Sequence, residues 1–120
     1  ARGEAVNAIY IKRLSDALRD GDSVRAVIRS STVNCDGKTV GMMNPSSDAQ
    51  EALIRSAYQH AGLASQYHQT GLFECHGTGT IVGDSMETAA IAKVFGRDGV
   101  IISGVRGPPD IPWRGIGPDC

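Results

Sequence analysis

One stretch, residues 72–102, constrains the fold of this chain more than any other. Residues 72–75, Leu-Phe-Glu-Cys, predict a strand, and the glycines and threonines of 76–80 predict a tight loop directly after it. A helix follows the loop, and the β-branched run 100–102 predicts another short strand. This order of strand, loop, helix and strand is typical of layered α/β folds.

The helix after the loop carries signals at both of its ends. Asp84 and Glu87 form a capping-box pattern at its start, and Gly96 predicts its end. Apolar residues predict the face that it buries: Ala89, Ala90, Ile91, Val94 and Phe95.

An earlier helix is marked in the same way. Ser47 and Gln50 form a second capping-box pattern, and Gly62 predicts the stop. We expect its apolar stripe to face the core: Leu53, Ile54, Ala57, Tyr58 and Ala61.

The first third of the chain predicts two strands around one short helix. Residues 5–12 and 24–33 are rich in β-branched side chains, and the apolar character of 5–12 favours burial on both sides. Between them, Ser15 is expected to cap a helix over residues 15–20 that Gly21 ends.

The overall composition disfavours several kinds of partner. With 41% hydrophobic residues, 21% charged residues and a net charge of -1, the chain resembles globular proteins and has no electrostatic attraction to nucleic acid or anionic membranes. No apolar run approaches the roughly 20 residues that a membrane helix needs. The first residues lack a secretion signal. We expect a cytoplasmic protein that has been cut from something longer.

Three cysteines, Cys35, Cys75 and Cys120, form no short-spaced pair. Their odd number argues against a closed disulfide framework, so we expect reduced thiols. The histidines do not combine with these cysteines at the close paired spacing of a structural zinc site. The sequence therefore favours no metal site.

His76 is the candidate catalytic residue of the loop. An imidazole changes its protonation state near neutral pH, and the glycines on either side of Thr78 leave room for a ligand beside the ring. The hydroxyls of Thr78 and Thr80 can orient an amide or a thioester arm. The alternative is a structural role, in which His76 ends the strand half-buried and bonds one backbone carbonyl.

The neighbours of His76 have simpler interpretations. Cys75 precedes it on an extended strand and points to the opposite face, so we expect a packed core thiol and no thiol–imidazole pair. Glu74 shares the face of His76, where it either orients the ring or is solvated. Asp84 is expected to be a helix cap and not a catalytic acid.

A nucleotide-binding loop is the main competing interpretation of the glycines. Gly77, Gly79 and Gly83 follow a strand and open a helix, where phosphates meet backbone donors. Their spacing is one residue longer than the dinucleotide fingerprint. The next strand ends in Ser103-Gly104, without the acidic residue that holds a ribose. We therefore disfavour a dinucleotide-binding module.

The loop His76-Gly77-Thr78-Gly79-Thr80, followed by Gly83-Asp84, resembles the histidine loop of β-ketoacyl synthase domains in type I polyketide synthases. Other segments resemble the same family in the same order: Arg2-Gly3-Glu4, residues 12–17, residues 33–37, and Pro45 with Ala49-Gln50-Glu51. The resemblance covers residue 1 to about residue 103, and it is similar in character to iterative synthases of fungal type.

This resemblance implies a thiolase-like fold with layered α/β/α/β/α architecture, of which the chain is an incomplete fragment, and a homodimer in the full-length enzyme. It implies a decarboxylative Claisen condensation that joins an acyl thioester to a malonyl unit. The malonyl unit is carried on the phosphopantetheine arm of an acyl carrier protein. His76 matches a catalytic histidine that polarises the malonyl carbonyl, and Thr78 and Thr80 match hydroxyls that bind the arm. The implied partners include neither nucleic acid nor a membrane.

Departures from the family limit these expectations. The family's nucleophilic cysteine would precede residue 1, and its second histidine is missing from residues 104–120. We therefore expect the isolated chain to be inactive. A non-catalytic piece that serves only as a dimer or carrier-protein contact surface is the alternative function.

The last residues differ in character from the rest. Residues 104–120 contain four of the five prolines, which argues against a regular helix or a central strand. We interpret residues 1–103 as a partial ketosynthase domain and residues 104–120 as an atypical proline-rich tail, for which a reading-frame error and a cloning artefact are the alternative explanations.

Overall fold

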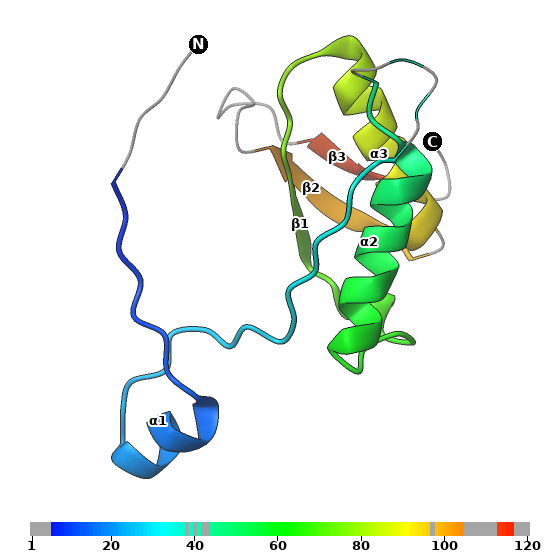
Figure 1. The fold of residues 1–120 in the computed structure, drawn as a ribbon. Helices are drawn as coiled ribbons and strands as arrows, with labels where there is room; N and C mark the ends of the chain where they lie inside the picture. The colour runs from blue at the N-terminus through cyan, green and yellow to red at the C-terminus, as the bar shows by residue number, and fades with distance from the viewer. Residues whose placement is uncertain are drawn as a thin grey trace.

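Two helices and a small sheet form the packed part of the molecule, and a long extended arm precedes them (Figure 1). The computed structural model describes residues 6–37, 39, 41, 44–96, 98–104 and 113–116, the last group by its backbone alone. The elements in chain order are α1 (Leu14–Asp20), α2 (Ser47–His60), the 3₁₀ helix η1 (Tyr67–Gln69), β1 (Leu72–Cys75), α3 (Ile81–Phe95), β2 (Val100–Gly104) and β3 (Trp113–Ile116).

The sheet is built around a strand–helix–strand unit. β1 and β2 are parallel, with Leu72 opposite Ile101 and Cys75 opposite Gly104, and α3 connects them. Their carboxyl ends therefore lie side by side. The predicted strands over residues 72–75 and 100–102 are confirmed.

β3 was not predicted, because it lies in the proline-rich tail. It pairs antiparallel with β2 and is one of the two edge strands of the described sheet. An edge position agrees with the expectation that the tail supplies no central strand. The boundary between residues 1–103 and 104–120 stays a prediction, since most of the tail lies outside the described residues.

The core lies between α3 and the sheet, with α2 packed against α3. Ile91 and Phe95 of α3 are almost completely buried, and they contact Cys75 of β1 and Val100 and Ile102 of β2. The predicted buried face of α3 is therefore confirmed for Ala90, Ile91 and Phe95, and Val94 packs partly buried against this cluster.

Ala89 is an exception, because it is exposed. It lies two residues before Ile91, which is a rotation of about 200° around the helix axis. Its side chain is consequently on the side of α3 that faces away from the sheet.

The predicted end of α2 is correct, whereas the predicted start is one residue too late. Ser46, not Ser47, is the N-cap, and its hydroxyl accepts the Ala49 N–H at 3.2 Å. Gly62 has φ +71°, and the N–H of Leu63 donates to the Tyr58 carbonyl at 2.8 Å, which closes the helix. The whole predicted stripe is partly buried, and Ile54 and Tyr58 pack on the core.

The predicted strands over residues 5–12 and 24–33 are wrong for the part that the structure describes. These segments are extended but have no strand partner among the described residues, and Ile9 and Tyr10 are 80% and 90% exposed. A strand needs a second strand to accept its hydrogen bonds, so an extended apolar pattern is not sufficient. The radius of gyration, 16.6 Å, exceeds the roughly 13.6 Å of a compact chain of this length because of this arm.

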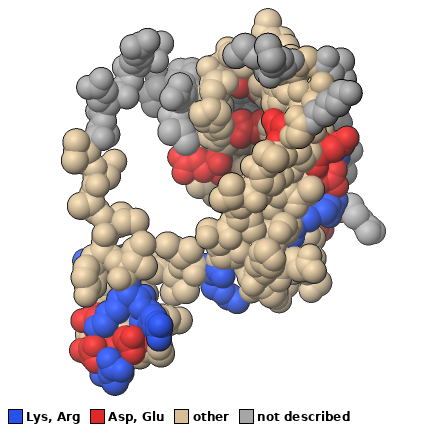
Figure 2. All heavy atoms as spheres, in the orientation of Figure 1, with Lys and Arg blue, Asp and Glu red and all other residues tan. Residues whose placement is uncertain are grey.

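Charges of both signs gather over α1, where the arm bends (Figure 2). The ammonium of Lys12 lies 2.6 Å from Asp20 and 2.5 Å from Asp22, so it joins the segments before and after the helix. These hydrogen bonds raise the pKa of Lys12. Gly21 ends α1 with φ +73° as predicted, whereas Arg13 and not Ser15 holds the N-cap position.

Candidate functional site

The predicted site loop, residues 76–80, leaves the carboxyl end of β1 and leads into α3 (Figure 1). Ligands of α/β proteins bind at the carboxyl ends of parallel strands, where loops meet outside the sheet. The side chains of His76, Thr78 and Thr80 are all exposed there. The structure thus places the three predicted site residues on one accessible loop.

The path of the loop depends on two glycines. Gly77 has φ +53° and Gly79 has φ +77°, which is the left-handed region that residues with a Cβ rarely adopt. These two turns bring the loop back over the start of α3. A side chain at either position would strain this path.

Glu87 holds the loop from inside the first turns of α3. Its Oε1 accepts the His76 N–H at 2.7 Å, and its Oε2 accepts the Gly77 N–H at 3.1 Å. Both carboxylate oxygens are therefore used to fix the backbone that carries the imidazole. From the sequence, Glu87 is predicted only as part of a helix cap. The available signal was an acidic residue one helical turn after the glycine loop.

The start of α3 also differs from the prediction. The helix begins at Ile81 with Thr80 as its N-cap, because the Thr80 hydroxyl accepts the Gly83 N–H at 3.2 Å. Asp84 lies in the first turn, and its carboxylate accepts the Gly79 N–H at 3.2 Å. The two acidic residues hold the loop and do not cap the helix as a capping box.

Thr78 and Thr80 form a hydroxyl pair on the exposed side of the loop. Their Oγ1 atoms are 3.2 Å apart, so one hydroxyl donates to the other. Each threonine hydroxyl carries one hydrogen and accepts through two lone pairs. With one hydrogen used inside the pair, one hydrogen remains for a ligand acceptor.

The hydrogen bonds of the loop argue against a phosphate site. The backbone N–H groups of His76, Gly77 and Gly79 already donate to carboxylates, and that of Gly83 donates to Thr80. Free N–H groups at a helix start are what bind phosphate in nucleotide loops. Two carboxylates at this position would in addition repel a phosphate.

Cys75 ends β1 as a packed core thiol, as predicted, whereas the side chain of His76 just after the strand is exposed. The Cys75 side chain is 6% exposed and belongs to the core. Burial raises the pKa of its thiol to about 12, and the charges of Glu87 and Asp84 add to this effect. The thiol is therefore protonated near neutral pH, and Cys75 is unsuited to nucleophilic chemistry. Cys35 is exposed, and Cys120 lies outside the described residues.

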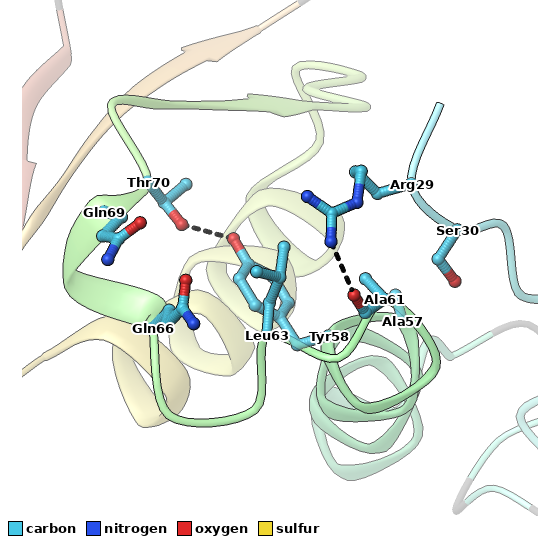
Figure 3. Close-up of a pocket in the computed structure, with 9 residues that line it drawn as sticks. All are labelled: Arg29, Ser30, Ala57, Tyr58, Ala61, Leu63, Gln66, Gln69 and Thr70. Atoms are coloured by element: carbon cyan, nitrogen blue, oxygen red, sulfur yellow. Dashed lines mark hydrogen bonds between the residues drawn. The ribbon is translucent and has the colours of Figure 1, made fainter. Parts of the chain in front are cut away.

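A separate pocket of about 400 Å³ opens near the amino end of β1 (Figure 3). Tyr58 and Thr70 bond each other through their hydroxyls in its wall, and Arg29 donates to the Ala61 carbonyl at 3.1 Å. Because the pocket is at the opposite end of β1 from residues 76–80, it is not part of the His76 site.

Neither a metal cluster nor a membrane segment was found in the described ranges. No group of three His, Cys, Asp or Glu side chains among these residues could hold a metal ion. Among the same residues, no helix is long and apolar enough to cross a membrane.

Comparisons with known proteins identify the family to which the chain is similar. A family model described as β-ketoacyl synthase, C-terminal domain, matches residues 25–107. The highly reducing polyketide synthase lcsB of Purpureocillium lilacinum is 59% identical over 105 residues, and sphB of Aspergillus fumigatus is 57% identical over 106 residues. Each match covers 88% of this chain and only 4% of the relative's length.

Solved ketosynthase domains with the thiolase-like fold are similar in structure. The oxazolomycin ketosynthase domain OzmH KS7 of Streptomyces albus superimposes with a TM-score of 0.71 at 37% identity, covering 88% of this chain and 18% of that domain. The ketosynthase from module 6 of the bacillaene synthase of Bacillus subtilis gives a TM-score of 0.71 at 36% identity, covering 79% and 18%. The predicted fold class, a thiolase-like α/β fragment, is confirmed.

Proposed function

The chain belongs to the β-ketoacyl synthase family, and we propose on that basis that its His76 loop serves decarboxylative Claisen condensation in a full-length polyketide synthase. In this reaction a malonyl thioester loses carbon dioxide, and the electron pair of the broken bond becomes an enolate. The enolate carbon then attacks an acyl thioester and forms the new carbon–carbon bond, and the acyl chain leaves its thiolate. His76 would act on the first of these steps.

The role proposed for His76 follows from its position. Its imidazole is exposed, while its backbone is fixed by the Glu87 carboxylate at 2.7 Å. A ring N–H that donates to the thioester carbonyl stabilises the negative charge that develops on that oxygen. Donors held in place before the reaction are the most effective, since they need no reorganisation. The observation that carries the proposal is an exposed imidazole on a backbone that Glu87 holds in place.

Thr78 and Thr80 are proposed to hold the arm that presents the malonyl group. The remaining hydrogen of their pair suits an amide carbonyl, and a phosphopantetheine arm contains two amides. The partner is then an acyl carrier protein, which supplies the arm as part of the substrate. Dimerisation of the full-length enzyme belongs to the same proposal. Membership of the family supports both the arm-binding role and dimerisation. The exposed position of the hydroxyl pair supports the arm-binding role.

A contact surface without catalysis is the second candidate function. It is favoured by the exposed apolar side chains of the arm, among them Val6, Ile9 and Tyr10. This function would not need the imidazole, so it predicts that replacing His76 leaves condensation unchanged. The substitution described in the Discussion therefore separates the two candidates.

Glu87→Gln tests the carboxylate that positions the loop. Glutamine keeps one acceptor oxygen but places an NH₂ group against the second backbone N–H. One charge-assisted bond is lost, and we expect condensation by the full-length synthase to fall about tenfold to a hundredfold. The turnover number with a malonyl carrier protein is the measurement. Glu51→Gln, which removes surface ion pairs with Arg55 and Lys93 outside the loop, is the matched control. Equal rates for both variants would contradict the role of Glu87.

The 120-residue chain alone is predicted not to condense malonyl and acyl thioesters. Its core thiol, Cys75, is buried and almost entirely protonated. We expect no carbon–carbon bond formation when the chain is mixed with acyl and malonyl carrier proteins, and product from a full-length ketosynthase in parallel. Product formed by the chain alone would disprove this prediction.

A further inference from the structure

Gly83 lies where a side chain would collide with the hydroxyl pair. A Cβ built on Gly83 would be 2.4 Å from Oγ1 of Thr80 and 3.4 Å from Oγ1 of Thr78. The first distance is shorter than any normal contact between a carbon and an oxygen atom. The Thr80 hydroxyl thus occupies space that the side chain of any other residue at position 83 would fill.

The backbone gives no reason for a glycine at this position. The glycines with positive φ in the described residues include Gly77 and Gly79 but not Gly83, which is the third residue of the regular helix α3. Alanine is favoured over glycine inside a helix. The contact with Thr80 therefore accounts for the glycine.

The same contact controls two hydrogen bonds. Oγ1 of Thr80 accepts the Gly83 N–H at 3.2 Å and pairs with Oγ1 of Thr78 at 3.2 Å. Something must shift to make room for a Cβ, and a turn of Thr80 about its Cα–Cβ bond would move Oγ1 away from both partners. The outward hydrogen of the pair would then lose its fixed direction.

We propose that Gly83 is a positioning residue, whose missing side chain keeps the Thr78–Thr80 hydroxyl pair aligned for the carbonyl of the incoming arm. This inference rests on the proposed function of the two threonines. It adds that the alignment is controlled from α3, by a residue that does not itself touch the ligand.

A double-mutant cycle in the full-length synthase tests the proposal. Gly83→Ala is expected to raise the KM for the malonyl carrier protein about tenfold, with a smaller effect on kcat, because one hydrogen bond to the arm is misaligned. Thr80→Ala should have a similar effect. Combining the two should add nothing, since the remaining neighbours of the new Cβ, Oγ1 of Thr78 at 3.4 Å and the Thr80 Cβ at 3.8 Å, lie at ordinary contact distances. Gly71→Ala is the matched control, because a Cβ there meets nothing within 4 Å.

The melting temperature of the same variants provides an independent result. Gly83→Ala should lower it in the wild-type background and leave it unchanged or raise it in the Thr80→Ala background. Equal effects in both backgrounds would overturn the proposal. In another outcome, the two substitutions are coupled in melting temperature but no variant changes the KM. That result would support the contact between Gly83 and Thr80 and overturn the proposed arm-binding role of the threonines.

Discussion

Replacing His76 by alanine is expected to lower the condensation rate of a full-length synthase that carries this segment about 10²–10³-fold, the usual effect of losing one donor to a developing oxyanion. The loss should fall on kcat, because the hydrogen bond strengthens as the enolate charge develops. Release of carbon dioxide from the malonyl carrier protein should fall with it. Both rates can be followed in single-turnover experiments.

His60→Ala and His68→Ala are the matched controls for this prediction. Both histidines are exposed, but they lie on α2 and η1, outside the loop. We expect neither to change either rate more than about twofold, since surface substitutions away from a site have small effects. Rates for His76→Ala that equal those of the controls would instead favour the contact-surface function.

Phe95→Ala is expected to cost about 3–5 kcal/mol in free energy of unfolding. Phe95 is 1% exposed, and its ring packs edge-on against three aromatic neighbours, with centroid distances of 5.8 Å to Tyr58, 5.9 Å to Tyr67 and 5.7 Å to Phe73. It therefore joins α2, η1 and β1 to α3. The loss is a large part of the roughly 5–15 kcal/mol that stabilises a typical domain.

Urea unfolding of the 120-residue chain, followed by circular dichroism, measures this cost. The matched control is Ile81→Ala, which removes an apolar side chain from the same helix at a position that is 92% exposed. We expect the control to change stability by no more than about 0.5 kcal/mol. A similar loss for both variants would show that Phe95 is not the centre of the core.

The elements whose signals are local were predictable from the sequence. The strand at residues 72–75 has the predicted bounds, and Gly62 and Gly21 end their helices with positive φ. A glycine after an apolar stripe is a reliable stop, because few other residues adopt that backbone conformation. The accessible His76 loop was also predictable, because glycines directly after a strand are a local signal for a turn.

Long-range contacts were not predictable in this way. The extended segments 5–12 and 24–33 show the pattern of strands, but a pattern does not reveal whether a partner is present. Glu87 was assigned to a cap because its spacing from Asp84 allows one. Only the fold shows that the carboxylate reaches back to the N–H groups of His76 and Gly77.

The position of a bound arm tests the central claim most directly. A crystal structure of a full-length ketosynthase carrying this segment, with a malonyl-pantetheine analogue that cannot lose carbon dioxide, would show it. We predict the thioester carbonyl oxygen at hydrogen-bond distance, about 2.7–3.2 Å, from a ring nitrogen of His76. An arm amide should lie beside Thr78 and Thr80. An arm bound away from this loop, for example in the pocket beside Tyr58, would contradict the account.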